Sequence, residues 1–133
     1  MTHNFNCRIY YEDTDAGGVV YYANYLKFAE RARTELLRSY AINQEVLATK
    51  HDVLFVVRSA ALELLRPAKL DDFLRIETEV IDVKAATIML EQNIYLENTK
   101  LCNIKIKLVV INKKFRPIRL PEFLKKVFSK DGC

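Results

Sequence analysis

Four consecutive segments with strand patterns fill most of the second half of the chain, and they limit the possible folds more than any other feature. After His51 the sequence reads VLFVVRSAALELLR, DDFLRIETEVIDVK, TIMLEQNIYLEN and KLCNIKIKLVVIN. Apolar side chains alternate with polar ones in the later segments, which is typical of strands that bury one face. Consecutive strands joined by short turns are antiparallel, because parallel neighbours need a long crossover. The sequence therefore predicts an antiparallel sheet.

One further strand and one long helix are expected ahead of this sheet. Cys7, Ile9 and Tyr11 alternate with polar residues, which predicts a first strand, and apolar residues recur at helical spacing from about Ala23 to Tyr40. Shorter helices are expected near INQEVLATKHD and after Pro121. The fold class is α+β, with a five-stranded antiparallel sheet wrapped around one long central helix. The 133 residues suit a single domain, and because one helix leaves apolar strand surface uncovered, we expect at least a dimer.

Composition removes several classes of protein. Three cysteines without CxxC spacing and two histidines do not suit a structural zinc site or a disulfide framework. The sequence shows no signal-peptide pattern and no apolar run long enough to span a membrane, so we expect a cytoplasmic protein. The net charge is +4, with acids interspersed among the basic residues, whereas a nucleic-acid-binding protein would need a concentrated basic face. We therefore expect no nucleic-acid partner.

The segment YYEDTDAGGVVYYANY places two acids, Asp13 and Asp15, just ahead of the long helix. One interpretation is that both are turn and cap residues, since aspartate favours those positions. The other is that one acid faces a substrate held by the unpaired N–H groups at the helix start, which can stabilise an oxyanion. Gly17 and Gly18 would then let the backbone approach a ligand without a Cβ in the way.

Elimination favours a carboxylate as the reactive group, if there is one. The chain has three glycines, too few for a GxSxG elbow or a glycine-rich nucleotide loop. We expect His3 in an N-terminal tail and His51 in a loop, so a serine–histidine or cysteine–histidine pair is not favoured. Arg33 is expected near the apolar side of the helix, and a buried arginine needs a partner, for which Glu30 is the local candidate.

A resemblance to a known family narrows these alternatives. The stretch YYEDTDAGGVVYYANYLKFAERAR resembles the signature of the YbgC branch of the 4-hydroxybenzoyl-CoA thioesterase family, the hotdog-fold acyl-CoA thioesterases. The similarity continues through FVVRSAALELLRPAKLDDFLRIETEV to RPIRLP, nearly the whole chain. It implies a hotdog subunit that hydrolyses acyl-CoA to free acid and CoA without a metal or redox cofactor. It also implies a homodimer or homotetramer with active sites between subunits.

The resemblance also implies residue roles. Asp15 falls on the family's catalytic carboxylate, acting as nucleophile or general base, and the backbone N–H of Tyr22 would polarise the thioester carbonyl. Many members have histidine where this chain has Tyr22. Tyr11 matches an aromatic residue near the acyl group, and Lys84 is our candidate for a contact with a CoA phosphate. The alternative function is a non-catalytic hotdog module that binds acyl-CoA or acyl-carrier protein, and Asp15 counts against it.

Overall fold

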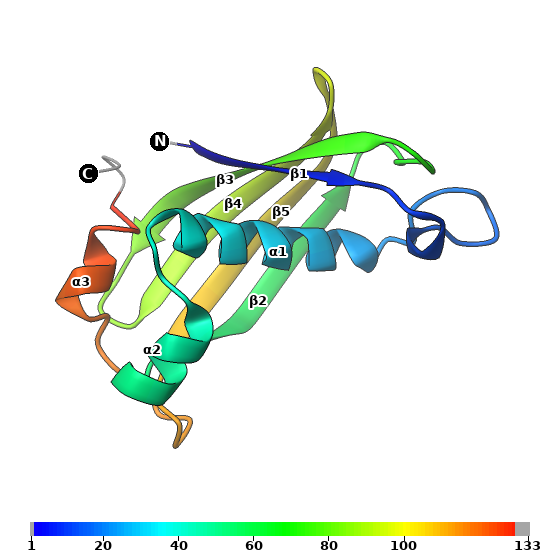
Figure 1. Cartoon of the computed structure of the whole chain (residues 1–133). Coiled ribbons are helices and arrows are strands. Elements are labelled where there is room, and N and C mark those ends of the chain that lie inside the picture. The colour runs from blue at the N-terminus through cyan, green and yellow to red at the C-terminus, as the bar shows by residue number, and fades with distance from the viewer. Residues whose placement is uncertain (1, 130–133) are drawn as a thin grey trace.

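The structure, a computed structural model, describes residues 2–129 and confirms the expected fold (Figure 1). A five-stranded antiparallel sheet curves around one long helix, α1, and two short helices lie near one end of the molecule. The elements in chain order are β1 (Thr2–Arg8), the 3-10 turn η1 (Tyr11–Asp13), α1 (Asn24–Ser39), α2 (Gln44–His51), β2 (Leu54–Leu64), β3 (Phe73–Val83), β4 (Thr87–Leu96), β5 (Thr99–Ile111) and α3 (Glu122–Lys125).

The strand order in the sheet is β1-β3-β4-β5-β2, and every neighbouring pair is antiparallel. The strands β3, β4 and β5 form the meander that the short turns predict. The strand β2 does not pair with β3, the next strand in the chain, but with β5, so residues 65–72 cross to the other side of the sheet. As a result β2 and β1 are the two edge strands.

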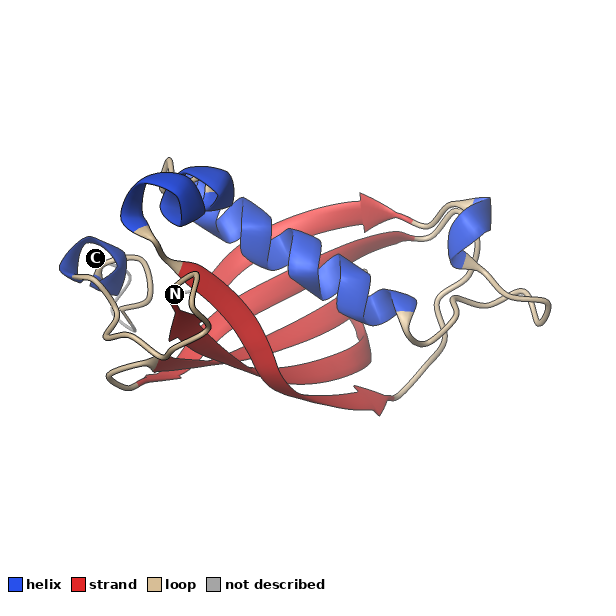
Figure 2. Cartoon of the chain, turned by 90° about the horizontal axis from the view of Figure 1, so that it is seen from below, coloured by secondary structure: helices blue, strands red, loops and turns tan. Residues whose placement is uncertain are grey.

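The core lies between α1 and the concave face of the sheet (Figure 2). Along β4 the side chains of Ile88, Leu90 and Ile94 are buried, as their alternation predicts. On the helix Ala29 and Ala32 are fully buried, and their small side chains let α1 approach the strands closely. Burial of this apolar face is what holds the helix in the curve of the sheet.

The N-terminal strand lies earlier in the chain than the sequence pattern indicates, since it begins at Thr2 and ends at Arg8. Arg8 pairs with Phe73, the first residue of β3, and Ile9 bonds instead to Asp71 and Asp72 in the loop ahead of β3. Tyr11 therefore lies in the turn η1, not at the end of a strand. The expectation of a tail at His3 is also wrong, since His3 is part of β1 and pairs with Thr78 of β3.

The expected ion pair of Arg33 is wrong in its partner. The Nη1 of Arg33 donates to the side-chain oxygen of Gln92 at 2.9 Å, and within residues 2–129 no carboxylate forms an ion pair with Arg33. Gln92 is fully buried on β4 and donates in turn to the Ala29 carbonyl and the Thr78 hydroxyl. Burial lowers the pKa of Arg33, and the charge of Glu30 opposes that shift. A neutral amide thus takes the place of the predicted acid.

Candidate active site

The loop between η1 and α1 is fixed by Asp13. Its carboxylate accepts a hydrogen bond from the N–H of Tyr10 at 2.8 Å, which closes the 3-10 turn. Its backbone carbonyl accepts from the N–H of Tyr21 and from the side chain of Asn24, the first residue of α1. Asp13 therefore joins the turn to the helix start, and its carboxylate accepts a hydrogen bond from the backbone of the turn.

Asp15 lies in a tight loop whose shape depends on two glycines. The loop closes where the N–H of Asp15 donates to the carbonyl of Val19, and the N–H of Gly18 donates back to the Asp15 carbonyl at 3.0 Å. Gly18 has a φ of 81°, a conformation that favours glycine. The N–H of Gly17 donates to Oδ1 of Asp15 at 2.8 Å, and a Cβ on Gly17 would lie 3.2 Å from that oxygen.

These contacts orient the Asp15 carboxylate. One oxygen is held by the Gly17 amide, and the other has no hydrogen-bond partner in the part of the chain that the structure describes. The side chain is exposed and borders a pocket. Asp13 also accepts one backbone N–H through its carboxylate, but of the two acids it is Asp15 that lines this pocket.

The pocket beside Asp15 has a volume of about 320 Å³ and joins two parts of the chain that are distant in sequence. The two buried residues that line it, Val20 and Tyr25, form its floor. The Tyr25 hydroxyl accepts a hydrogen bond from the Ala68 N–H at 3.0 Å, which fixes the ring. The other lining residues form a more open rim: Asp15, Val19, Tyr22, Leu64, Leu65, Arg66 and Pro67.

The start of α1, beside this pocket, has unpaired backbone N–H groups. Ala23, the N-cap residue, provides no side-chain cap. The backbone N–H groups of Tyr22 and Ala23 donate to no acceptor within residues 2–129. Such groups carry the positive end of the helix dipole and can stabilise negative charge on an oxygen atom. The Tyr22 N–H, the predicted donor, is therefore available to a ligand.

The structure does not bring every predicted site residue to this pocket. The Tyr11 side chain is 82% exposed and does not line it. Lys84 lies in the β3–β4 turn, close to α3 and at the opposite end of α1 from the Asp15 loop (Figure 1). There it lines a separate pocket of about 560 Å³ with Arg119 and Lys125. In a single chain, Lys84 and Asp15 are far apart.

Sequence reasoning missed the second half of the pocket. Leu64, Leu65, Arg66 and Pro67 come from the end of β2 and the loop that follows. The signal that could have found them is the segment LELLRPAKLDD, which carries part of the family resemblance. Among residues 2–129, no group of three or more His, Cys, Asp and Glu side chains is placed to hold a metal ion.

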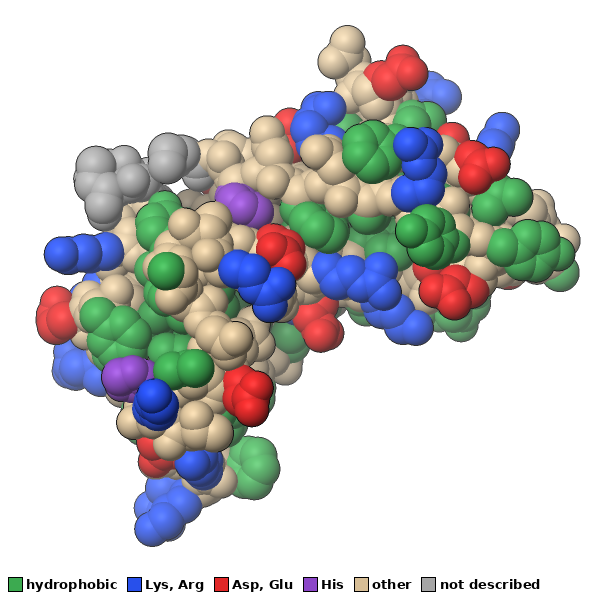
Figure 3. Space-filling model, in the orientation of Figure 1, with side chains coloured by type: hydrophobic (Ala, Val, Ile, Leu, Met, Phe, Trp, Pro, Cys, Tyr) green, Lys and Arg blue, Asp and Glu red, His purple; other side chains and the backbone are tan. Residues whose placement is uncertain are grey.

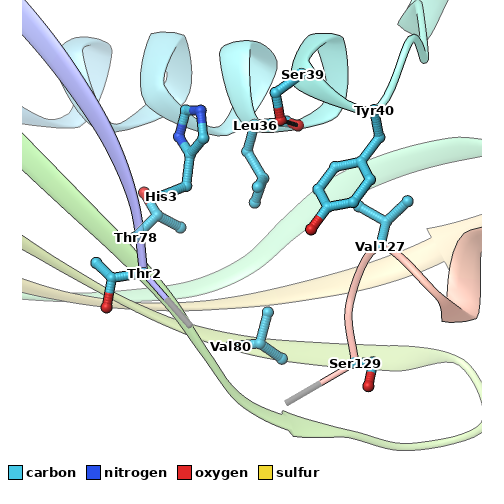
Figure 4. Close-up of a pocket in the computed structure, with 9 residues that line it drawn as sticks. All are labelled: Thr2, His3, Leu36, Ser39, Tyr40, Thr78, Val80, Val127 and Ser129. Atoms are coloured by element: carbon cyan, nitrogen blue, oxygen red, sulfur yellow. Dashed lines mark hydrogen bonds between the residues drawn. The ribbon is translucent and has the colours of Figure 1, made fainter. Parts of the chain in front are cut away.

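A smaller cavity lies at the far end of α1, and Figure 4 shows its lining. It has a volume of about 120 Å³, and His3, Ser39 and Tyr40 are among the residues around it. The Nδ1 of His3 is buried and has no hydrogen-bond partner within residues 2–129. Burial lowers the pKa of His3, and the charge of Glu35 opposes this shift. This cavity contains no residue of the Asp15 pocket.

Comparison with known proteins assigns the class that this fold and pocket define. The family model of the Thioesterase superfamily matches residues 17–103, about two thirds of the chain, so the chain belongs to the thioesterase superfamily. Within it, the sequence groups with the YbgC thioesterases. It is 44% identical to acyl-CoA thioesterase YbgC of Haemophilus influenzae, over 94% of this chain and 93% of that protein.

Two further relatives agree with this assignment. Acyl-CoA thioesterase YbgC of Helicobacter pylori is 38% identical, over 92% of this chain and 97% of its own length. The crystal structure of a probable thioesterase from Bartonella henselae superposes with a TM-score of 0.88 at 38% identity, and the match covers 91% of this chain and all of that one. The hotdog fold and the family resemblance seen in the sequence are therefore confirmed.

Proposed function

We propose that this chain hydrolyses acyl-CoA thioesters to a free acid and CoA, with Asp15 and the Tyr22 N–H as the catalytic groups. The names of its relatives support this substrate class. The observation that carries the catalytic assignment is that Asp15 and Tyr22 both line one pocket. The Gly17 N–H orients the carboxylate of Asp15, and the N–H of Tyr22 has no acceptor within residues 2–129. A carboxylate and an oxyanion donor are the two parts that acyl transfer needs.

The Tyr22 N–H donates a hydrogen bond to the thioester carbonyl oxygen, where negative charge develops during attack. In one route the free oxygen of Asp15 attacks the carbonyl carbon, the CoA thiolate leaves, and water then hydrolyses the anhydride that formed. In the other route Asp15 takes a proton from a water, whose oxygen attacks the carbonyl carbon. The departing thiolate is then protonated, and acid and CoA are released. Neither route needs a metal or redox cofactor.

A second copy of the chain on the edge of β2 would complete the pocket. This edge strand exposes apolar side chains, among them Val57 at 49% and Leu64 at 51%. Leu64 also lines the Asp15 pocket, so a neighbour that pairs with β2 would border the acyl group. We therefore propose a homodimer, alone or as half of a homotetramer, with active sites at the subunit interface.

The CoA phosphates are proposed to bind the basic pocket around Lys84. Lys84, Arg119 and Lys125 line this pocket together, and Asp82 is the one acid among the described residues of its lining. The antiparallel arrangement of a dimer would bring this end of one subunit toward the Asp15 end of the other. An acyl-carrier protein presents the same thioester on a phosphopantetheine arm and is the other substrate carrier that this site suits. The free thiols of Cys7 and Cys102 fit the cytoplasm, where we place the enzyme.

Replacing Asp15 by asparagine tests this function. We expect turnover of acyl-CoA to fall by roughly 10²–10⁴-fold, the usual worth of a positioned base, while substrate binding is retained. Asp13→Asn is a matched control, since its carboxylate supports the turn and should affect stability more than chemistry. Tyr22→Phe keeps the backbone donor and should leave the rate nearly unchanged.

The assay follows thiol release from a panel of acyl-CoA thioesters that differ in chain length and aromaticity. Near wild-type turnover by Asp15→Asn would contradict the assignment of the carboxylate. Tight acyl-CoA binding with no turnover by the wild-type protein would instead favour the non-catalytic module.

A further inference from the structure

The loop that joins β5 to α3 carries an exposed phenylalanine in an unfavourable backbone conformation. Phe115 is 78% exposed and has a φ of 61°, in the left-handed region that bulky residues rarely adopt. It makes no ring contact with another residue among those that the structure describes. Neither burial nor backbone geometry within one chain explains a phenylalanine at this position, which makes it a candidate for contact with another surface.

The loop is held in this shape by several hydrogen bonds. The side chain of Asn112 accepts from the N–H groups of Lys114 and Arg116, and the Phe115 N–H donates to the Asn112 carbonyl at 2.9 Å. The N–H of Lys113 donates to the carboxylate of Asp52 at 2.8 Å, which ties the loop to the end of α2. Phe115 is thus presented on an ordered projection, the orange loop at the bottom of Figure 1.

Positive charge is concentrated around the same loop. Residues 112–126, which run from this loop through α3, contain six Lys or Arg residues and one Glu, a net charge of +5, whereas the whole chain carries +4. The remainder of the chain therefore has a net charge of −1. Arg119 and Lys125 of this segment line the Lys84 pocket, and Lys113, Lys114 and Arg116 lie in the loop itself. Figure 3 shows Lys and Arg side chains gathered on the lower tip of the molecule, which this loop forms. Because acids are interspersed in the rest of the sequence, the net charge of the whole chain does not reveal that this segment is strongly basic.

We propose that this loop is a peripheral anchor for an anionic lipid bilayer, with Phe115 entering the headgroup region and Lys113, Lys114 and Arg116 facing lipid phosphates. A single exposed aromatic ring surrounded by cations matches the two attractions that hold peripheral proteins on such a surface. No helix within residues 2–129 is long and apolar enough to cross a membrane, so the proposed contact is superficial. A dimer would carry two such loops, and their contributions would combine.

Cosedimentation of the full chain with vesicles tests the proposal. We expect binding to vesicles of phosphatidylglycerol and phosphatidylcholine in equal parts, weakening as salt is added, and little binding to phosphatidylcholine alone. Phe115→Ser should lower the partition coefficient by roughly tenfold or more, because the ring loses its favourable transfer out of water. Lys113→Gln with Lys114→Gln should reduce it by a similar factor on anionic vesicles.

Matched controls distinguish the contribution of this loop from that of any exposed ring or any surface charge. Phe73→Ser removes another half-exposed ring. Lys105→Gln with Lys107→Gln removes two charges from the outer face of β5. Both of these control variants should bind vesicles as the wild type does. Phe115→Gly should bind vesicles weakly yet unfold at the same or a higher temperature, since glycine adopts the positive φ without strain.

Three results would overturn the proposal. One is wild-type binding that is absent, or equal on neutral and anionic vesicles. Another is vesicle binding that saturating free CoA abolishes, which would assign these cations to the substrate site. The third is Phe115-dependent retention on single-stranded nucleic acid or on an acidic protein without any vesicle binding, which would assign the loop to that partner. Failure of the Asp15 assay would leave the vesicle result unaffected, so the two hypotheses are tested separately.

Discussion

Replacing Gln92 by leucine should destabilise the protein because this buried amide connects the helix to the sheet. Gln92 has no solvent exposure, and it links Arg33 and Ala29 of α1 to Thr78 of β3 through three hydrogen bonds of 2.9 to 3.0 Å. Leucine has a similar volume and fits the apolar neighbours on β4. The substitution therefore removes the hydrogen bonds without opening a large cavity.

The expected cost follows from the groups left without partners. Loss of the hydrogen bond to the charged Arg33 costs about 1.5–3 kcal/mol, and the buried Thr78 hydroxyl costs about 1–3 kcal/mol if it stays unpaired. The Ala29 carbonyl keeps its acceptor role inside α1 and adds little. Arg33 is only partly buried, so its head can turn toward water, and the greater burial of leucine offsets part of the loss. We expect a net loss of about 2–4 kcal/mol.

Urea denaturation followed by circular dichroism measures this loss as a shift of the midpoint at constant slope. Asn103→Leu is the matched control: it removes an amide with two side-chain hydrogen bonds from the outer, half-exposed face of β5, and it should cost less. A double-mutant cycle with Arg33→Met isolates the pair, for which we expect a coupling energy above about 1 kcal/mol. A Gln92→Leu variant as stable as the wild type, or a coupling energy near zero, would refute this account of the core.

Two further outcomes are expected. Burial lowers the pKa of His3 in the folded state, so the unfolded chain takes up a proton first as the pH falls. The free energy of unfolding should therefore decrease below about pH 6.5, by at most about 1.4 kcal/mol per pH unit. His3→Asn should remove this component of the pH profile, and an unchanged profile would contradict it. Val57→Lys places a charge on the exposed edge of β2 and should convert the proposed dimer to monomer in light scattering. Asn4→Lys on the opposite edge strand should leave the size unchanged.

Much of the fold could be predicted because its signals are local. Alternation along β3, β4 and β5 fixes which side chains face the helix, and the helical spacing places Ala29 and Ala32 against the sheet. The failures have long-range causes. The end of β1 depends on where its partner β3 begins, because Arg8 pairs with Phe73, and the partner of Arg33 is Gln92, which is remote in sequence. A helical wheel shows that Arg33 is partly buried, but it does not show which sheet residue lies beneath it.

The candidate site divides in the same way. The acids and glycines of one loop are close in sequence, so their association was predictable, although the glycine contribution differs from the expected one. Gly17 holds the Asp15 carboxylate through its N–H, and Gly18 supplies the positive φ of the loop. The rim formed by Leu64 and Leu65 comes from the far edge of the sheet, and the crossing of residues 65–72 places it beside Asp15.

Because Asp15 is exposed in a single chain, the proposed dimer would affect the chemistry of the site by excluding water from it. In one chain Asp15 is exposed, and water solvates the charge of its carboxylate, which makes it a weaker nucleophile than it would be in a dry site. A neighbour paired along β2 would cover Leu64 and exclude water from the same pocket. Activity should therefore depend on the dimer, and Val57→Lys should lose turnover together with dimerisation although it leaves Asp15 and Tyr22 in place. A monomeric Val57→Lys variant that hydrolyses acyl-CoA at the wild-type rate would show that one chain is sufficient, and would remove this reason for placing the site at the sheet edge.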